Sequence, residues 1–361
     1  MKNKVKLGEL VNIKTGKLDA NAANNKGKYP FFTTSEETFK IDTYAYDDEA
    51  VLVAGNGNLN VKYFYGKFNA YQRTYILTKK ENLKVNIKYI YYFLDKYLET
   101  LRSVSIGGVI KYIKLENLIN PVLDLPTIEI QNKIVKKLDT LKEVLDMYEK
   151  KINLLSNFNK SLFTMMFGDI KTNDKNWEIK KLGEVVQTQY GTSKKATSIV
   201  GEFPILRMNN ITYSGEMDYK DLKYIELSDS EKEKFLLKKG ELLFNRTNSK
   251  ELVGKTGLFN LDIPMAFAGY LIRIKPSNLI HSKFLLFFMN SEFMKKLLYN
   301  KAKNIVGMAN INAKELEDFS IILPPIELQN KFAERTEKIE KLKFIRKNKK
   351  VSAWWKIKKL I

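Results

Sequence analysis

Cysteine is absent from this chain of 361 residues, and histidine occurs only once, at His281. Without cysteine the chain has no disulfide, no thiol nucleophile and no zinc site built on thiolates, and it suits a reducing cytoplasm. A single histidine cannot form a histidine metal cluster, and such a residue is far more often a surface or capping residue than a catalytic one.

Long apolar runs are also missing. No stretch of 18 apolar residues occurs, and no charged-then-apolar leader opens the chain. We therefore expect neither a membrane span nor export, and we expect a cytoplasmic protein. The length and the 44% hydrophobic content fit two globular domains, each with a core of its own.

Catalytic motifs are scarce. Gly254-Lys255-Thr256 resembles the end of a phosphate-binding loop, but the glycine that this motif requires five residues earlier is Ser249. Glu178-Ile179-Lys180 has the Glu-x-Lys spacing of nuclease sites, which chance supplies in a chain so rich in both residues. Neither an Asn-Pro-Pro-aromatic methyltransferase signature nor a G-x-G-x-x-G turn occurs. We therefore expect no catalysis, no metal site and no cofactor on this chain, and we disfavour a nuclease.

Acidic residues are too few to balance the basic ones. The chain has 62 lysines and arginines against 41 aspartates and glutamates, which leaves a formal net charge of +21. A proteome rich in lysine and asparagine would produce such an excess without any function. The alternative is a polyanionic partner, because counterion release from nucleic acid rewards an excess of this size.

A long helix is expected between Pro126 and Asp169. No glycine or proline interrupts residues 127–167, and Gly168 follows directly, where positive φ can end a helix. Apolar residues recur there in alternating steps of four and three, at Ile134, Leu138, Leu141, Leu145, Tyr148, Ile152 and Leu155. That spacing forms a seam along one face of a helix about 60 Å long, and the seam needs a partner helix to cover it.

The chain repeats itself. Two motifs return in the same order, and one glycine is matched: LPTIEIQNK at 125–133 and LPPIELQNK at 323–331, KLGELV at 6–11 and KLGEVV at 181–186, Gly16 and Gly191. Chance does not supply nine aligned positions with matching flanks, so we infer a duplication. The chain then divides into a globular domain over 1–125, a central helix over 126–170, a second globular domain over 171–322 and a C-terminal helix over 323–361.

Each globular domain reads as a mixture of strands and helices. Short β-prone runs end in Gly, Asn or Asp turns, and we align the strand at 241–246 with the strand at 49–54. A helix is expected to close each sheet, over 87–101 in the first half and over 283–298 in the second.

The second long helix has a weaker seam. Phe332, Ile339 and Leu342 give it an apolar face, but this face decays near Phe344. Residues 341–361 hold nine basic residues and no acidic one, and nothing there matches 157–168 of the first helix. We expect this tail to be truncated or replaced relative to its counterpart.

Recognition chemistry is the remaining candidate for function. Loops after the β-prone runs carry Asn, Gln and Arg, which present paired donors and acceptors to base edges, and lysines that can hold phosphates. The candidate DNA-binding residues are Lys17, Asn56, Asn58, Gln72, Arg73, Lys194, Lys195, Arg207, Asn209, Asn210, Asn245, Arg246 and Asn248. For Asn56 and Asn58, a purely structural role in a turn is an equal alternative.

These motifs resemble those of the specificity subunit of type I restriction-modification systems. The resemblance rests on LGE at 7–9 and 182–184, on LFNRT at 243–247, and above all on the repeated motif at 125–133 and 323–331. It implies an α+β fold in which two target recognition domains, each reading half of a bipartite DNA site, are separated by two long helices packed as an antiparallel coiled coil. It also implies docking of methyltransferase subunits that use S-adenosylmethionine, and of ATP-driven restriction subunits.

Two alternatives remain open. The chain could be a truncated or orphan recognition subunit that acts as a dimer. It could also be a non-catalytic, basic coiled-coil adaptor that binds acidic proteins, in which case the positive charge is incidental.

Overall fold

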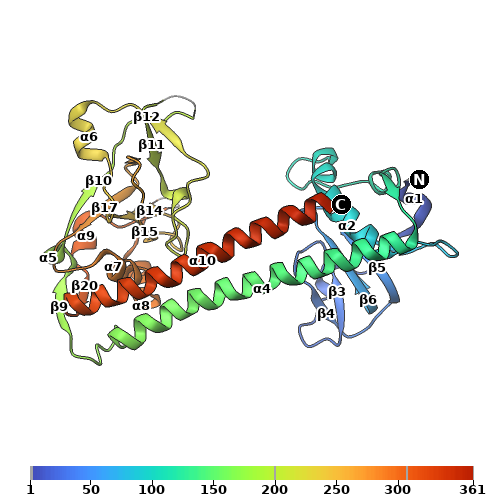
Figure 1. Cartoon of the computed structure of the whole chain (residues 1–361), viewed down its shortest axis with the longest axis horizontal. Helices are drawn as coiled ribbons and strands as arrows, with labels where there is room; N and C mark the ends of the chain where they lie inside the picture. Colours follow the sequence, from blue (N-terminus) through green and yellow to red (C-terminus); the bar gives the residue numbers. More distant parts are fainter. Residues whose placement is uncertain (1–2, 199–200, 306–307, 361) are drawn as a thin grey trace. The chain divides into compact units, whose positions relative to one another are not determined.

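The computed structural model describes residues 3–198, 201–305 and 308–360 (Figure 1). Its contacts divide the chain into unit 1, Met1–Lys150 with Arg346–Ile361, and unit 2, Lys151–Ile345. The division passes through both long helices, so each helix contributes to both units. Within the described residues, no helix is long and apolar enough to cross a membrane.

Unit 1 is built on a six-stranded sheet in the order β2-β7-β5-β6-β3-β4. All neighbouring strands are antiparallel except β3, which runs parallel to β6. The strands are β2 (Val11–Thr15), β3 (Tyr29–Phe32), β4 (Phe39–Ile41), β5 (Tyr46–Ala54), β6 (Val61–Ala70) and β7 (Thr74–Lys79). A separate antiparallel pair joins β1 (Asn3–Lys6) to β8 (Val122–Leu125), and the short helices are α1 (Leu7–Leu10), η1 (Ala20–Ala22) and α3 (Glu116–Ile119).

Both faces of this sheet are buried. Along β5 the side chains alternate, so Val51 and Val53 join the core beneath helix α2 (Ile87–Val104), whereas Ala50 and Leu52 join a smaller cluster on the other face. The helix expected over 87–101 is therefore confirmed as α2, one turn longer than predicted.

Unit 2 repeats the plan with smaller sheets, in the orders β10-β17-β13-β15, β12-β11-β16, β14-β19-β18 and β20-β9. The strands are β9 (Glu178–Lys181), β10 (Val186–Tyr190), β11 (Phe203–Leu206), β12 (Lys223–Ile225), β13 (Leu242–Asn245), β14 (Thr247–Asn248), β15 (Thr256–Leu258), β16 (Ala266–Phe267), β17 (Leu271–Pro276), β18 (Lys303–Ile305), β19 (Met308–Asn310) and β20 (Ser320–Leu323). The shorter helices are α5 (Leu182–Val185), η2 (Met208–Asn210), α6 (Asp229–Phe235), α7 (Ser282–Met289), α8 (Glu292–Lys301) and α9 (Ala313–Glu317).

The single helix expected over 283–298 is wrong, because the structure breaks it into α7 and α8. Asn290 ends α7 and uses its side-chain amide to donate to the Thr256 carbonyl over 2.8 Å. Ser291 then caps α8 by accepting from the Met294 N–H over 3.1 Å. Two polar residues that each satisfy backbone groups in this way stop one helix and start the next.

The two long helices are α4 (Ile128–Phe167) and α10 (Ile326–Leu360). As expected, α4 ends at Gly168, whose φ is +80°. In unit 2 the Phe332 ring of α10 lies 5.3 Å from Phe167 of α4, and in unit 1 Lys350 of α10 forms an ion pair with Glu149 of α4. Later residues of α10 thus meet earlier residues of α4, so the helices run antiparallel.

Helix α10 does not stop where its apolar face weakens. Phe344 is 66% exposed, but the helix continues to Leu360. After Ile339, Glu340 is half-buried next to it, and the side chains that then turn inward are Lys343, Arg346, Lys350 and Ala353. Counted from Ile339, these four follow the steps of four and three that a seam requires. Leu342 is 47% exposed and lies outside this row, so its assignment to the seam does not fit the structure.

The burial of the α4 seam changes along the helix. Its first members, Ile134 and Leu138, pack into the core of unit 1, and Leu138 is fully buried there. Further along, Leu141, Leu145, Tyr148, Ile152 and Leu155 are half-buried. Asn159 continues the spacing as a buried amide whose Oδ1 has no partner among the described atoms.

Candidate nucleic-acid interface

The repeated LPxIExQNK motif attaches each long helix to its unit. Gln131 is fully buried, its Oε1 accepts from the Asn86 N–H over 2.9 Å, and its Nε2 donates to the Pro126 carbonyl over 2.8 Å. Gln329 does the same in unit 2, with the His281 N–H over 2.8 Å and the Pro324 carbonyl over 2.7 Å. The motif is therefore a structural joint in both units.

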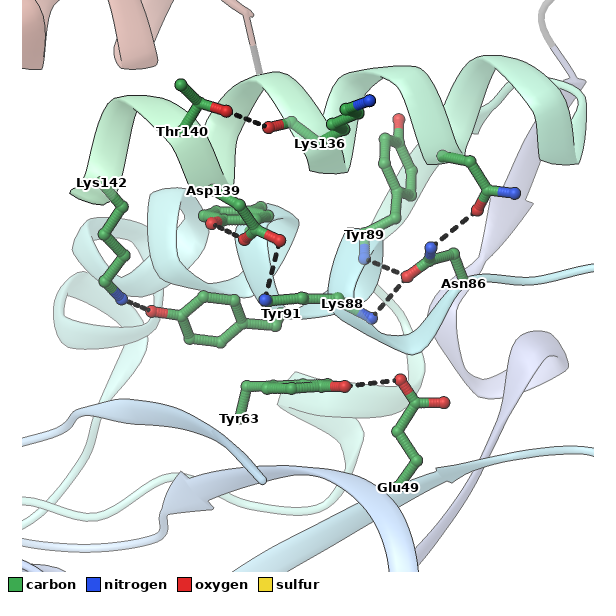
Figure 2. Close-up of polar contacts among 12 residues, drawn as sticks. Glu49, Tyr63, Asn86, Lys88, Tyr89, Tyr91, Lys136, Asp139, Thr140 and Lys142 are labelled. Carbon is green, nitrogen blue, oxygen red and sulfur yellow. Dashed lines mark hydrogen bonds and ion pairs between the residues drawn. The ribbon is translucent and has the colours of Figure 1, made fainter. Parts of the chain in front are cut away.

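Charged and phenolic groups strengthen this joint in unit 1 (Figure 2). Asp139 of α4 accepts from Lys88 over 2.8 Å and from the Tyr92 hydroxyl over 2.6 Å. Burial is the main cause that raises the pKa of Tyr92, followed by its bond to Asp139. In unit 2 the matching Lys283 of α7 pairs with Glu340 of α10 over 2.9 Å. Each long helix is thus held by a lysine at the start of the helix beneath it.

In unit 1 the loops that were predicted to recognise DNA meet at one edge of the sheet. The Gly16 N–H donates to the Thr74 carbonyl over 3.1 Å, and the Gly55 N–H donates to the Arg73 carbonyl over 2.8 Å. Gly16 allows this approach because a Cβ there would lie 2.2 Å from the Ala70 oxygen. The candidates gathered at this edge are Lys17, Asn56, Asn58, Gln72 and Arg73.

Unit 2 builds the same edge with the same backbone bonds. The Gly191 N–H donates to the Leu271 carbonyl over 3.2 Å, and the Arg246 N–H donates to the Tyr270 carbonyl over 3.0 Å. A Cβ at Gly191 would lie 2.3 Å from the Ala268 oxygen, so this glycine is required for the reason that applies to Gly16. We call each of these regions a reading edge: residues 16–19, 55–58 and 71–73 in unit 1, and 191–195, 246–248 and 268–270 in unit 2.

These bonds correct our alignment of the two halves by one residue. Ala54 pairs with Thr74 in unit 1 and Asn245 pairs with Leu271 in unit 2, so the counterpart of Ala54 is Asn245, not Arg246. Arg246 then corresponds to Gly55, and a shift of one residue along a strand moves a side chain to the opposite face. Arg73 of unit 1 in turn corresponds to Tyr270 of unit 2. The arginines of the two reading edges therefore occupy different positions.

Arg246 is the best-oriented cation of the unit 2 reading edge. Its guanidinium carbon lies 4.8 Å from the centre of the Tyr190 ring, and its Nη2 donates to Asn310 Oδ1 over 3.3 Å. Its Nε is buried and has no partner among the described atoms, so it is not open to DNA. Its Nη1 also donates to the Gly269 carbonyl over 3.5 Å. Stacking on tyrosine and these two bonds hold a planar donor group in place, and each Nη keeps one further N–H for an acceptor such as a base edge.

Two of the predicted contact residues face inward instead. Asn210 is 2% exposed, and its Nδ2 donates to the Asp218 and Asp221 carbonyls, so it shapes the loop that it belongs to. Asn245 is fully buried and points to the same side of β13 as the core residue Leu243. Neither side chain is at the surface, so we leave both out of the contact set.

Other predicted residues are held by carboxylates. Arg207 pairs with Asp221 over 2.8 Å, and Lys194 pairs with Glu231 over 2.6 Å. The Lys194 ammonium is the main cause that lowers the pKa of Glu231 to about 2. Asn58 donates to Glu36 Oε1 over 2.9 Å. These residues are at the surface, but an approaching duplex would have to compete with a carboxylate for each of them.

The remaining predicted residues are open or nearly so. Lys17, Gln72, Arg73, Lys195 and Asn209 are exposed. Asn56 is half-buried and bridges to Tyr112, and half-buried Asn248 accepts from the Ser249 N–H. Only amides, guanidinium groups and ammonium groups occur in this open set.

One surface feature was not among the predicted site residues. Residues 106–112 form a hairpin whose Tyr112 bridges to Asn56 and whose Lys111 carbonyl accepts from the Gly57 N–H, so it belongs beside the unit 1 reading edge. Its tip residues Val109 and Ile110 are 102% and 62% exposed. The signal in the sequence is the Gly107-Gly108 pair next to the apolar residues Val109 and Ile110.

No metal-binding cluster accompanies these edges in the described part of the chain. Among its residues, no group of three or more His, Cys, Asp and Glu side chains could hold a metal ion. His281 is the N-cap of α7, since its Nδ1 accepts from the Lys283 N–H over 3.0 Å. The expectation of a capping histidine is confirmed.

Comparison with known proteins gives one consistent family. The family model for the type I restriction modification DNA specificity domain matches residues 2–157 and 174–352. The type I restriction enzyme EcoDI specificity subunit of Escherichia coli is 38% identical over 164 residues, which covers 44% of this chain and 36% of that protein. The MjaVIII specificity subunit of Methanocaldococcus jannaschii is 23% identical over 96% of this chain and 88% of that protein.

A solved structure has the same fold. The S subunit of a type I restriction-modification system from M. genitalium superposes with a TM-score of 0.63 at 16% identity, covering all of this chain and 95% of that one. The match to the EcoKI specificity subunit of Escherichia coli, 28% identical over 67% of this chain, spans only 56% of that protein. The chain thus spans between a third and a little over half of these two Escherichia coli relatives, and it belongs to the family defined by the type I restriction modification DNA specificity domain.

Proposed function

We propose that this chain is the DNA sequence-specificity subunit of a type I restriction-modification complex and reads a bipartite site in double-stranded DNA. The observation that carries the proposal is the repeated reading edge, built in both units by equivalent backbone bonds but furnished with different side chains. One scaffold with two sets of donors fits two half-sites of different sequence.

Different side chains contact the bases and the phosphates. Arg73 and Gln72 in unit 1, and Arg246 and Asn248 in unit 2, carry the paired donors that distinguish base edges in the major groove. Lys17 and Lys195 hold phosphates, and the net charge of +21 supplies affinity that does not depend on sequence.

The chemistry resides on the partners. We propose that this chain is non-catalytic and cytoplasmic, that it docks methyltransferase and restriction subunits, and that S-adenosylmethionine and ATP bind to those subunits. Supporting this division, the described residues form reading edges and structural joints, and the only histidine of the sequence is engaged as a helix cap.

The test removes one arginine from each unit in turn and asks which half of the DNA site loses its specificity. Arg246→Ala removes a bidentate donor from unit 2 and Arg73→Ala removes one from unit 1, at a cost of roughly 1–3 kcal/mol of discrimination each. In the complex with a methyltransferase subunit, methylated sites are mapped on random-sequence DNA. We expect Arg246→Ala to relax one half-site and Arg73→Ala to relax the other, so that each variant is the control for its counterpart. If either variant degrades both half-sites equally, the assignment of one half-site to each unit fails.

A further inference from the structure

We propose that a lysine-lined cavity in unit 2, here called the lysine pocket, holds a phosphate group of the DNA backbone. The cavity measures about 370 Å³, and its walls include Lys250, Lys255, Lys295, Lys296, Tyr213 and Tyr299. The proposal deepens the function proposed above, and it rests on that function only in naming DNA as the source of the phosphate.

Lys255 is the anchor of the lysine pocket. Its side chain is almost enclosed, with 8% of the residue exposed, and its Nζ donates to the Met208 carbonyl over 2.9 Å. Burial lowers the pKa of Lys255, and no carboxylate of the described residues pairs with it. An ammonium group without a counterion in such a position is stabilised by an anion that enters the cavity.

Aromatic rings direct two further lysines into the lysine pocket. Lys295 Nζ lies 3.7 Å from the centre of the Tyr213 ring and donates to the Tyr213 carbonyl over 2.6 Å. Lys250 Nζ lies 4.6 Å from the centre of the Tyr299 ring. Burial first and the charge of Lys160 second lower the pKa of Lys295, and a bound anion would raise that pKa because an opposite charge favours the ammonium form.

Two glutamates also line the lysine pocket, but they do not neutralise it. Glu251 and Glu292 are both exposed, and neither forms an ion pair with a described lysine of the pocket. The Glu251 carboxylate is engaged by its own N–H and by the Ser249 side chain, which lower its pKa, and the charge of Lys250 adds a smaller lowering. Four ammonium groups therefore face two carboxylates at the rim.

The sequence near-match to a phosphate-binding loop lies in this wall. Residues 249–256 read SKELVGKT, and they place Lys250 and Lys255 on the cavity. The surrounding structure is not that of a nucleotide-hydrolysing loop, because Thr256 opens the strand β15 where such loops open a helix. The Thr256 hydroxyl is also buried and donates to the Gly254 carbonyl over 3.2 Å, so it is not available to a metal ion.

The position of the lysine pocket favours DNA over a free ligand. The Asn245 N–H donates to the Lys255 carbonyl over 2.9 Å, so Lys255 is one strand away from the unit 2 reading edge, which begins at Arg246. Met208, whose carbonyl holds Lys255, begins the short helix η2 and stands between Arg207 and Asn209 in the same unit. A phosphate in the cavity would belong to the duplex that this reading edge contacts.

The test measures the salt dependence of DNA binding by the full-length chain. Each phosphate contact contributes about 0.9 to the slope of log K against log salt. The cavity holds one phosphate, so we expect Lys250→Met with Lys296→Met, and separately Lys255→Met, each to reduce the slope by up to about one. The preferred sequence should stay unchanged because phosphate contacts carry no base information. The control is Lys171→Met with Lys275→Met, which loses the same charge from unit 2 outside the pocket and leaves the slope unchanged.

Calorimetry with inorganic phosphate and with ATP, in the absence of DNA, separates the two sources of phosphate. One outcome is that the parent chain binds inorganic phosphate or ATP, that the double variant Lys250→Met, Lys296→Met does not, and that the salt-dependence slope for DNA is unchanged. The lysine pocket is then a phosphate site for a free ligand, and the assignment to DNA is wrong. Slopes equal to that of the control, with no phosphate or ATP binding, overturn the proposal. If the parent chain binds DNA without any preference for base sequence, the proposed function is refuted. The salt-dependence slopes of the variants on random-sequence DNA would still test the lysine pocket.

Discussion

His281 occupies in unit 2 the place that Asn86 has in unit 1: each caps the helix beneath a long helix, and each donates its N–H to the glutamine of the repeated motif. The difference is that only the histidine titrates near neutral pH. Burial, followed by the neighbouring Lys283, lowers the pKa of His281, while Glu337 opposes them. The two joints therefore respond differently to acid.

We predict that unit 2 loses stability as the pH falls below about 6.5, the pKa of an unperturbed histidine. Because the folded protein lowers this pKa, the unfolded state binds the proton first, so the stabilisation is complete above pH 6.5 and is lost as the pH falls toward the folded pKa. A protonated Nδ1 also cannot accept from the Lys283 N–H. Denaturant unfolding between pH 5.5 and 8 measures this loss, and His281→Asn, which copies unit 1, should keep the cap and remove its contribution to the pH dependence. An unchanged pH profile in that variant would show that other groups are responsible.

The buried glutamines should be among the costlier residues to remove. Gln131→Ala leaves the Asn86 N–H without its acceptor, and Gln329→Ala leaves the His281 N–H without one, so each should destabilise its own unit by about 1–3 kcal/mol. Asn330→Ala, at the exposed position next to Gln329, is the control and should change stability by less than about 0.5 kcal/mol. Hydrogen exchange resolved by residue would show which unit is affected, and loss of protection in both units from one variant would contradict independent joints.

The observed seam of α10 makes opposite predictions for two neighbouring apolar residues. Ile339 is 7% exposed, so Ile339→Ala should cost about 2–4 kcal/mol of unfolding free energy. Leu342 is 47% exposed, and Leu342→Ala should cost less than about 0.5 kcal/mol. The seam expected from the sequence includes both residues and predicts similar costs for the two variants. Urea unfolding of the two variants decides between that seam and the observed one.

The long helices should set the spacing of the DNA site. Inserting seven residues into α4 and seven into α10 keeps the repeat of the seam and adds about 10 Å to each helix, a length of about three base pairs. We expect the mapped sites to keep both half-site sequences and to change the number of bases between them. Four residues inserted into α4 alone shift its seam and should destabilise the helix pair instead. An unchanged spacer in the seven-residue variant would refute this role.

Much of the architecture could be predicted because it follows from local pattern. The duplicated motif, the uninterrupted run of α4 and the paired Gly16 and Gly191 all leave marks that are visible in the sequence. Each mark has a local physical cause: seam spacing, the absence of helix breakers, or a backbone approach that excludes a Cβ.

What could not be predicted depends on partners far away in the sequence. Whether Asn245 faces the core or the surface depends on the register between β13 and β17, and a shift of one residue reverses the answer. The break at Asn290 depends on the Thr256 carbonyl, 34 positions earlier in the chain. The lysine pocket combines a loop with α8 and a distant tyrosine, so no short motif encodes it.

Main-chain bonds form the frame of both reading edges, such as those that the Ile113 and Ile311 N–H groups donate to the carbonyls of Gly55 and Arg246. A bond of this kind is indifferent to the side chain at either end, which is why glycine in one half and arginine in the other fit the same frame. Mutations at positions 73, 246 and 270 can therefore accumulate without unfolding the domain that carries them, whereas position 55 is restricted because a Cβ on Gly55 would lie 2.6 Å from the Arg73 carbonyl oxygen. The scaffold thus allows the DNA target of one unit to change by mutation while the other unit keeps its target.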